Sequence, residues 1–176
     1  ESGFENVYVP PSPGDDGAAL GCAAFGRIHG QGRQLKKTAT FSPYLGGSYT
    51  ADEIDAALRD AGSRIVIEQP DDLTGEVAQR IADGQVVAWF QGRSEFGPRA
   101  LGSRSILAHP GKAGMVDHLN LRVKGREKFR PFAPSVLAEE AEGIFDGLCP
   151  SPYMSITVPV KPGETDRVPA VTHVDD

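Results

Sequence analysis

The chain has 176 residues, 39% of them hydrophobic, which is enough for one packed domain and part of another. Its formal net charge of −6 argues against a protein that coats nucleic acid, although it allows a local basic groove. The sequence holds neither an apolar run of about 18 residues nor a basic and then apolar leader, so we expect a cytoplasmic protein.

The segment PSPGDDGAALGCAAF predicts the first helix, which ends near Phe25. Asp15 or Asp16 can cap this helix, because a side-chain oxygen at such a position accepts a hydrogen bond from a free backbone amide. The alternative is a carboxylate beside a phosphate or a metal-bound nucleotide at the helix N-terminus. From the residues alone, we favour the cap.

The next part of the chain predicts a connection followed by regular structure. Residues 27–48 are polar and rich in glycine, as in a linker or a long surface loop. Residues 50–53, TADE, form a capping box that begins a helix, and Gly62 ends that helix. The β-branched residues of Arg64–Glu68 predict a short strand.

A second helix and a strand lead the chain to its most unusual segment. The helix follows Pro70, and its apolar residues Leu73, Val77 and Ile81 share one face. Val86–Phe90 is apolar throughout, as expected for a central strand that is covered on both faces. Further predicted elements are strands over residues 105–109, 132–137, 154–160 and 168–174 and helices over residues 113–121 and 138–145.

The strand that ends at Phe90 continues directly into the loop QGRSEFGPRALGSR. Ligands of open α/β sheets lie beyond the carboxyl ends of the strands, so this loop is the expected position of a site. Gly97, Pro98 and Gly102 shape its backbone, because proline fixes φ and glycine lets the backbone approach a ligand. Its arginines offer planar guanidinium groups that suit phosphate or carboxylate.

Positive charge is concentrated between this loop and Arg130. That stretch holds nine of the chain's eighteen basic residues against three acidic ones, the basic residues being Arg93, Arg99, Arg104, Lys112, Arg122, Lys124, Arg126, Lys128 and Arg130. In VKGREKFRPF, residues 123–132, an extended backbone would place four cations on one face. Neighbouring like charges repel by about 1 kcal/mol in water, and a bound anion removes that cost. A solvated edge strand is the alternative, but the arginines favour an oxyanion site.

The motifs EFGPRALGSRSILAHP and VKGREKFRPFAPSVL, together with PSPGDDGAALGCAAF, resemble the O-carbamoyltransferases that tailor antibiotics and nodulation factors. The resemblance implies an α/β fold in two parts. Residues 1–45 would be the end of a metal-binding, actin-like ATPase domain and a linker. Residues 46–176 would be a YrdC-like domain, a twisted mixed sheet with flanking helices, incomplete at its C-terminus. We therefore expect a fragment.

The resemblance also implies a reaction. The YrdC-like domain would form carbamoyl-adenylate and pyrophosphate from carbamoyl phosphate and ATP with Mg²⁺, and the carbamoyl group would then pass to a hydroxyl of a small-molecule acceptor. The residues that match cations used by the family around these substrates are Arg99, Lys124 and Arg130. Second-rank candidates for binding substrate or nucleotide are Arg93, Arg104 and Arg126. All would act as electrostatic clamps and not as nucleophiles.

Asp15 matches the aspartate that ligates a divalent metal in the family's N-terminal domain, which makes metal binding the favoured role there. Fe²⁺ is one candidate for that metal. The family's metal histidines and a late Ser-x-Asn segment are not within the sequence, so we expect the isolated piece to be a poor catalyst.

Two other functions are open from the sequence. An RNA- or nucleotide-binding YrdC-like module without catalysis would use the alternating cations and phenylalanines. A catalytically silent structural or regulatory domain would have kept only the fold. The acceptor and the oligomeric state, a homodimer being one option, cannot be read from these residues.

Overall fold

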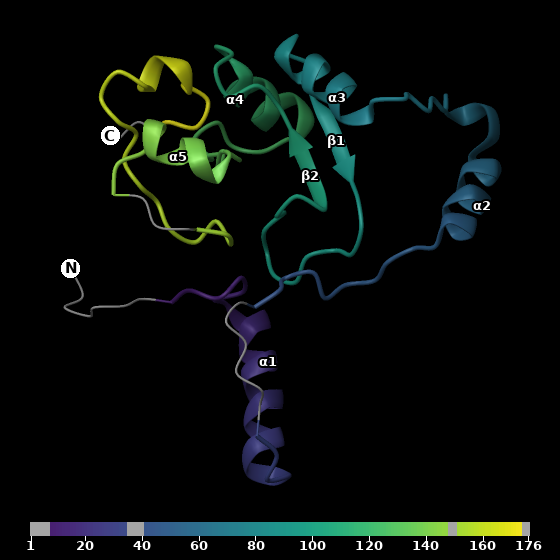
Figure 1. The fold of residues 1–176 in the computed structure, drawn as a ribbon, viewed down its shortest axis with the longest axis vertical. Helices are drawn as coiled ribbons and strands as arrows, with labels where there is room; N and C mark the ends of the chain where they lie inside the picture. Colours follow the sequence, from purple (N-terminus) through teal and green to yellow (C-terminus); the bar gives the residue numbers. More distant parts are fainter. Residues whose placement is uncertain (1–7, 35–40, 148–150, 174–176) are drawn as a thin grey trace. The chain divides into compact units, whose positions relative to one another are not determined.

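The computed structural model describes residues 8–34, 41–147 and 151–173 (Figure 1). The chain divides into two compact units. The first unit comprises residues 1–60, 90–105 and 151–155, and the second comprises residues 61–89, 106–150 and 156–176. The domain boundary expected at residue 45 stays a prediction.

Helix α1 (Asp15–Phe25) confirms the first predicted helix but not its cap. Gly14 is the N-cap residue, with extended backbone, and no side chain caps the helix. Asp15 and Asp16 lie inside the first turn, where negative charge is favourable beside the helix dipole. The capping role favoured from the residues alone is therefore wrong.

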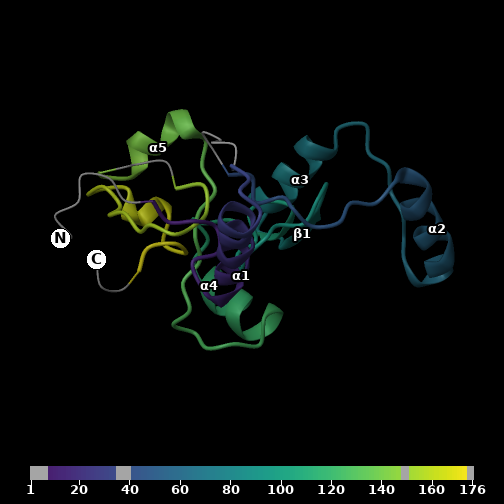
Figure 2. The same ribbon diagram turned by 90° about the horizontal axis from the view of Figure 1, so that it is seen from below.

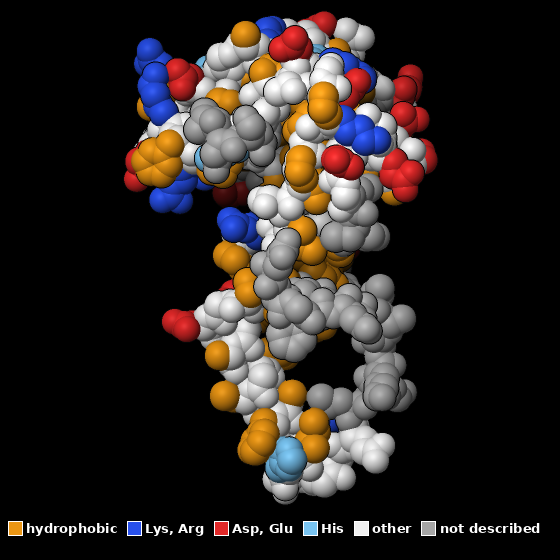
Figure 3. Space-filling model, turned by 90° about the vertical axis from the view of Figure 1, so that its left-hand side faces the viewer, with side chains coloured by type: hydrophobic (Ala, Val, Ile, Leu, Met, Phe, Trp, Pro, Cys, Tyr) orange, Lys and Arg blue, Asp and Glu red, His pale blue; other side chains and the backbone are white. Residues whose placement is uncertain are grey.

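No residue of α1 is buried, and apolar side chains lie at the surface along it (Figure 3). A π-helical turn, Gly26–Gly30, continues the helix. None of the small residues of α1 is buried, although Gly17 in its first turn lies close to the backbone of Ser12.

Helix α2 (Ala51–Ala61) begins at the predicted capping box. The backbone amide of Thr50 donates to Oε2 of Glu53 over 2.8 Å, and the amide of Glu53 donates to Oγ1 of Thr50 over 3.3 Å. The hydrogen bonds from Thr50 lower the pKa of Glu53. The reciprocal pair satisfies two amides at the helix start, which confirms the prediction.

The strand predicted over Arg64–Glu68 is wrong. Gly62–Arg64 forms a 3₁₀ turn, and the residues after Ile65 have no regular structure. Val66 is 89% exposed. Since β-branched residues favour strands mainly through packing on a partly buried sheet surface, these residues lack the neighbours that would make them a strand.

Helix α3 (Leu73–Ala82) confirms the second predicted helix, and the Asp72 side chain caps it by accepting from the amide of Gly75 over 2.9 Å. Strands β1 (Val87–Phe90) and β2 (Arg104–Leu107) then form a two-stranded antiparallel sheet (Figure 1). The prediction of a central, fully covered strand is wrong, because alternate β1 residues are exposed.

The second unit contains two more predicted helices. Helix α4 (Met115–Asp117) continues as a π-helical turn, His118–Val123, and α5 (Ala138–Ile144) follows later in the chain. The buried apolar residues of this unit are Met115, Leu119, Ala141, Phe145 and Val168. Three of them, Met115, Leu119 and Ala141, belong to these helical segments.

The last three predicted strands are not formed by the described residues. Residues 132–137 and 155–159 have no regular structure, residues 169–171 form a turn, and residue 174 lies outside the described residues. An isolated antiparallel bridge joins Phe145 to Val160, which places the C-terminal segment beside α5 (Figure 2). These runs have strand-like composition without a sheet to join.

The described residues therefore have the α/β character that we predicted, with five α-helices and one small sheet. The YrdC-like mixed sheet stays a prediction. Within the same residues, no helix has both the length and the hydrophobicity needed to cross a membrane.

Candidate functional site

The carboxylate of Glu95 organises the loop between β1 and β2. Its Oε1 atom accepts hydrogen bonds from three backbone amides, those of Leu101 at 2.8 Å, Ser103 at 2.7 Å and Arg104 at 3.2 Å. Partial burial raises the pKa of Glu95, but the backbone hydrogen bonds outweigh it and hold the pKa below its ordinary value. The loop thus closes around an ionised side chain.

The guanidinium of Arg104 stabilises the same loop. Nη1 donates to the carbonyl oxygens of Gln91 at 2.7 Å and Ser103 at 2.9 Å, and Nη2 donates to that of Gly92 at 3.1 Å. Its Cζ atom lies 3.5 Å from the centroid of the Phe90 ring. This cation–π contact and three hydrogen bonds fix the side chain against the backbone.

Arg93 connects the loop to a second chain segment. Nε donates to the carbonyl of Gly46 at 2.9 Å and Nη2 to that of Leu45 at 3.2 Å, while the Gly46 amide donates to the carbonyl of Ser94 at 2.9 Å. The guanidinium groups of Arg93 and Arg104 therefore stabilise the loop. Their predicted contact with substrate or nucleotide stays a prediction.

Arg99 differs from these two arginines. Its side chain is exposed and has no hydrogen-bond or ion-pair partner among the described residues. Gly97, two positions earlier, has φ of +106°, and a Cβ atom there would lie 2.5 Å from the carbonyl oxygen of Pro11. The backbone beside Arg99 is thus packed closely on the PSPGDD segment, so the two motifs touch within the first unit.

In the second unit, the segment 123–132 folds around Asn120. The Nδ2 atom of Asn120 donates to the carbonyl oxygens of Lys128 at 3.1 Å and Arg130 at 2.9 Å, and its Oδ1 accepts from Nε of Arg126 at 2.7 Å. The Arg126 amide also donates to the carbonyl of Asn120 at 2.8 Å. The segment is therefore not extended, so the condition under which its four cations would share one face is not met.

Two cations of this segment have acidic partners at the surface. Nζ of Lys128 lies 2.8 Å from Oδ2 of Asp117, and Nε of Arg130 lies 3.0 Å from Oε2 of Glu127. A hydrogen bond from its own backbone amide and the charge of Arg130 lower the pKa of Glu127. Because all four side chains are exposed, these pairs hold their cations weakly.

The other two cations behave differently from each other. Arg126 points toward Asn120, and its Cζ atom lies 4.8 Å from the centroid of the Phe132 ring. Lys124 is exposed, and its ammonium has no partner in the part of the chain that the structure describes. Lys124 and Arg130 thus remain available to an anion, as Arg99 does in the first unit.

A cavity of about 220 Å³ lies against this segment in the second unit. The residues that line it include Lys128, Phe129, Arg130, Phe132, Val171 and His173. We call it the cationic pocket. Arg130 is the predicted site residue that lines it, and its walls combine apolar surface with two cations, as ligand sites commonly do.

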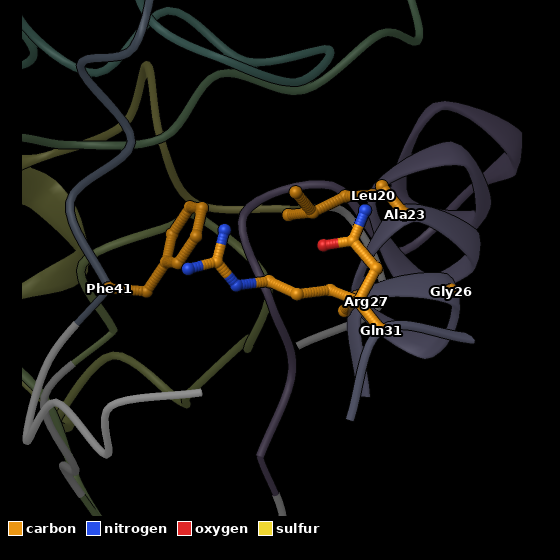
Figure 4. A pocket seen from close by; sticks show the side chains of 7 residues that line it. Leu20, Ala23, Gly26, Arg27, Gln31 and Phe41 are labelled. Carbon is orange, nitrogen blue, oxygen red and sulfur yellow. The ribbon is translucent and has the colours of Figure 1, made fainter. Parts of the chain in front are cut away.

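A second, open cavity of about 740 Å³ lies beside α1 (Figure 4). Arg27 is the charged residue among those that line it, and its guanidinium extends toward the ring of Phe41. None of the predicted site residues lines this cavity. It therefore adds nothing to the predicted site.

Asp15 is exposed in the first turn of α1. Within the described ranges, no three or more His, Cys, Asp and Glu side chains gather closely enough to hold a metal ion. One carboxylate cannot hold a metal ion by itself, so the described residues alone do not form a metal site. The metal-binding role of Asp15 stays a prediction.

Sequence reasoning missed Glu95 and Asn120. Both act on backbone groups that come together only after the loops have closed. One signal was visible for Asn120: it is a polar residue between Leu119 and Leu121 in a helical segment, where a buried polar side chain needs a partner.

Comparisons with known proteins bear on what this arrangement does. Residues 78–176 match the family model described as carbamoyltransferase C-terminus. The chain is 43% identical to nodulation protein NolNO of Sinorhizobium fredii, over 98% of the chain and 26% of that protein. It is 40% identical to nodulation protein NolO of Bradyrhizobium diazoefficiens, over 98% of the chain and 32% of that protein.

A third relative, nodulation protein U of Sinorhizobium fredii, is 40% identical over 98% of the chain and 28% of its own length. The chain thus spans about a third or less of these curated relatives. The family model covers more than half of the chain, and the resemblance seen in its motifs is confirmed. The chain belongs to the carbamoyltransferase C-terminus family.

Proposed function

We propose that the chain is part of an ATP-dependent O-carbamoyltransferase. Water would first cleave carbamoyl phosphate to carbamate and inorganic phosphate. A carbamate oxygen would then attack the α-phosphorus of ATP, forming carbamoyl-adenylate and releasing pyrophosphate. Finally, an acceptor hydroxyl would attack the carbamoyl carbon, lose its proton and release AMP. Family membership supports carbamoyl transfer, and the cationic loops support the two anionic substrates.

The observation that carries this proposal is the exposed guanidinium of Arg99, which has no partner among the described residues. Its loop is fixed by Glu95 and Arg104, yet its own guanidinium meets no anion among the described residues. A cation that is carried on a fixed loop and has no anionic partner is free to bind an anionic substrate and to stabilise the negative charge that develops on it. A structural arginine would instead be held as Arg104 is.

Arg130 supports the same function from the cationic pocket. Its ion pair with Glu127 is exposed, and such pairs contribute only about 0–1 kcal/mol. A phosphate group can replace Glu127 at small cost, because charge-assisted contacts to a bound anion contribute about 1.5–3 kcal/mol each. Lys124, whose ammonium is unpaired among the described residues, is a further cation of the same segment.

The proposed reaction also requires metal ions and an acceptor. Mg²⁺ would accompany ATP and neutralise part of its charge. A divalent metal, with Asp15 as one ligand, would serve the domain that transfers the carbamoyl group, and residues elsewhere in the protein would have to complete that site. The acceptor is a hydroxyl-bearing small molecule.

The test is the exchange of labelled pyrophosphate into ATP by the complete protein, with and without carbamoyl phosphate. We expect exchange that depends on carbamoyl phosphate. We also expect Arg99→Ala to slow it about 10- to 100-fold, because one charge-assisted contact is lost. Arg59→Ala, which removes an exposed arginine from the last turn of α2, is the matched control and should leave the rate unchanged.

Wild-type protein that shows no exchange would refute the adenylate-forming reaction. Equal rates for Arg99→Ala and Arg59→Ala would refute the role of Arg99 even where exchange occurs. A fragment of residues 1–176 should be tested in parallel, and we expect it to be a poor catalyst.

A further inference from the structure

Asn120 stands apart from every other side chain that the structure describes. It is the one large side chain that is fully buried, at 0% exposure, and it is polar. All the hydrogen bonds of its amide go to one segment: Nδ2 donates to the carbonyls of Lys128 and Arg130, and Oδ1 accepts from Arg126. A fully buried amide is costly unless its hydrogen bonds are made, and here they are.

These contacts define the path of the backbone rather than the position of a charge. Two carbonyl groups two residues apart are held by the same nitrogen, which curves the chain between them. Gly125 assists with φ of +58°, a conformation that other residues adopt at a cost. The exposed side chains of Lys128 and Arg130 are carried on this curve.

Arg126 helps to hold the segment in place and is not one of its exposed cations. Its Nε donates to Asn120 at 2.7 Å, and its guanidinium lies over the ring of Phe132. Phe132 also lines the cationic pocket. Contacts therefore run from the buried amide of Asn120 through Arg126 to Phe132 in the wall of the pocket.

We propose that Asn120 is a positioning residue that fixes the curved segment 124–130 so that Arg130 presents its charge to an anionic substrate in the cationic pocket. Arg126 is the second positioning residue, and it acts through Asn120. The identity of the substrate, carbamoyl phosphate, rests on the proposed function. The contacts by which Asn120 fixes the segment do not depend on the proposed function.

The experiment compares the complete wild-type protein with Asn120→Asp and Arg126→Met. Asn120→Asp keeps the shape but loses the donor to both carbonyls, and Arg126→Met keeps an apolar side chain over Phe132 but loses the donor to Oδ1. The control is Gln79→Ala, which removes an exposed amide whose Nε2 donates to Oδ1 of Asp83 over 2.9 Å in the same unit.

The first measurement is the rate of tryptic cleavage after Lys124, Arg126 and Lys128, followed by mass spectrometry. We expect cleavage after Lys124 and Lys128 to become about 10-fold faster in both variants, because a protease needs an extended, released backbone. Cleavage after Arg80 in α3 serves as the internal reference and should not change, which separates local release from global unfolding.

The second measurement is the KM for carbamoyl phosphate in pyrophosphate exchange. We expect it to rise about 10- to 100-fold in both variants, with a smaller change in kcat, since a misplaced cation weakens substrate binding first. Gln79→Ala should keep the wild-type KM. If Asn120→Asp unfolds, which the reference site would reveal, Arg126→Met gives both readouts.

Unchanged cleavage in the variants would overturn the proposal whatever the activity. Faster cleavage with an unchanged KM would overturn the link to the substrate. Wild-type protein without exchange would mean that the proposed function has failed, and the cleavage rates would then decide alone whether Asn120 holds the segment.

Discussion

The loop of residues 91–103 and the segment of residues 119–132 carry predicted site cations in different ways. Each folds around one polar side chain, which is Glu95 in the first and Asn120 in the second. Glu95 meets only amide donors, so an acceptor is sufficient. Asn120 meets two carbonyls and a guanidinium, so its side chain must both donate and accept.

Burial follows the same division. Asn120 is fully buried, whereas Glu95 is only partly buried. A neutral amide with complete hydrogen bonding is tolerated in a dry interior, but an ionised carboxylate there is expensive. The comparison shows that the hydrogen-bonding groups around the central side chain decide which residue type fits at its position. The cations carried on the same segment do not decide it.

Replacing the amide by a carboxylate at position 120 should therefore destabilise the protein more than replacing the carboxylate by an amide at position 95. Asn120→Asp should have the larger effect and lower the free energy of unfolding by about 3 kcal/mol at pH 7, because a buried carboxylate would face two carbonyl oxygens and its contact with Arg126 offsets that only in part. Urea denaturation of the complete protein measures this, with the slope against urea concentration as the check on the unfolded state. A loss no greater than that of Glu95→Gln would break the comparison.

Glu95→Gln should cost less, about 1 kcal/mol at pH 7, because the amide oxygen still accepts but without charge. The loss should also depend on pH. The folded-state pKa of Glu95 lies below its ordinary value of 4.5, so its contribution is complete above that value and disappears as the pH falls through the folded-state pKa.

Wild type and Glu95→Gln should therefore converge in stability as the pH is lowered below about 4.5. Urea denaturation at pH 7, 5, 4 and 3 would follow the difference between them. A constant difference over this range would mean that the ionised carboxylate is not what closes the loop.

The helices were largely predictable, since their signals are local. The capping box at Thr50 and Glu53 needs only residues three apart, and it forms as expected. The sequence could not show that residues 64–68 and 132–137 do not form strands. A β-branched composition indicates that a segment can pack in a sheet, but it does not indicate whether a partner strand is present.

The site divides along the same line. Sequence pattern and resemblance pointed to Arg99 and Arg130, because the motifs that hold these residues are contiguous. They could not show that Arg104 and Arg126 turn inward, since their partners are the loop carbonyl of Gln91 and the side-chain oxygen of Asn120. A guanidinium that supports a loop and one that faces a ligand look alike in a sequence.

The smallest effect is expected from the exposed ion pair of the second segment. Lys128→Gln removes the charge that faces Asp117 but leaves the Lys128 carbonyl on Asn120, so the segment keeps its shape. The free energy of unfolding should change by less than about 0.5 kcal/mol, and any change should vanish in high salt. Urea denaturation at low and high salt measures both. A loss close to that of Asn120→Asp would mean that surface charge, and not the buried amide, holds the segment in place.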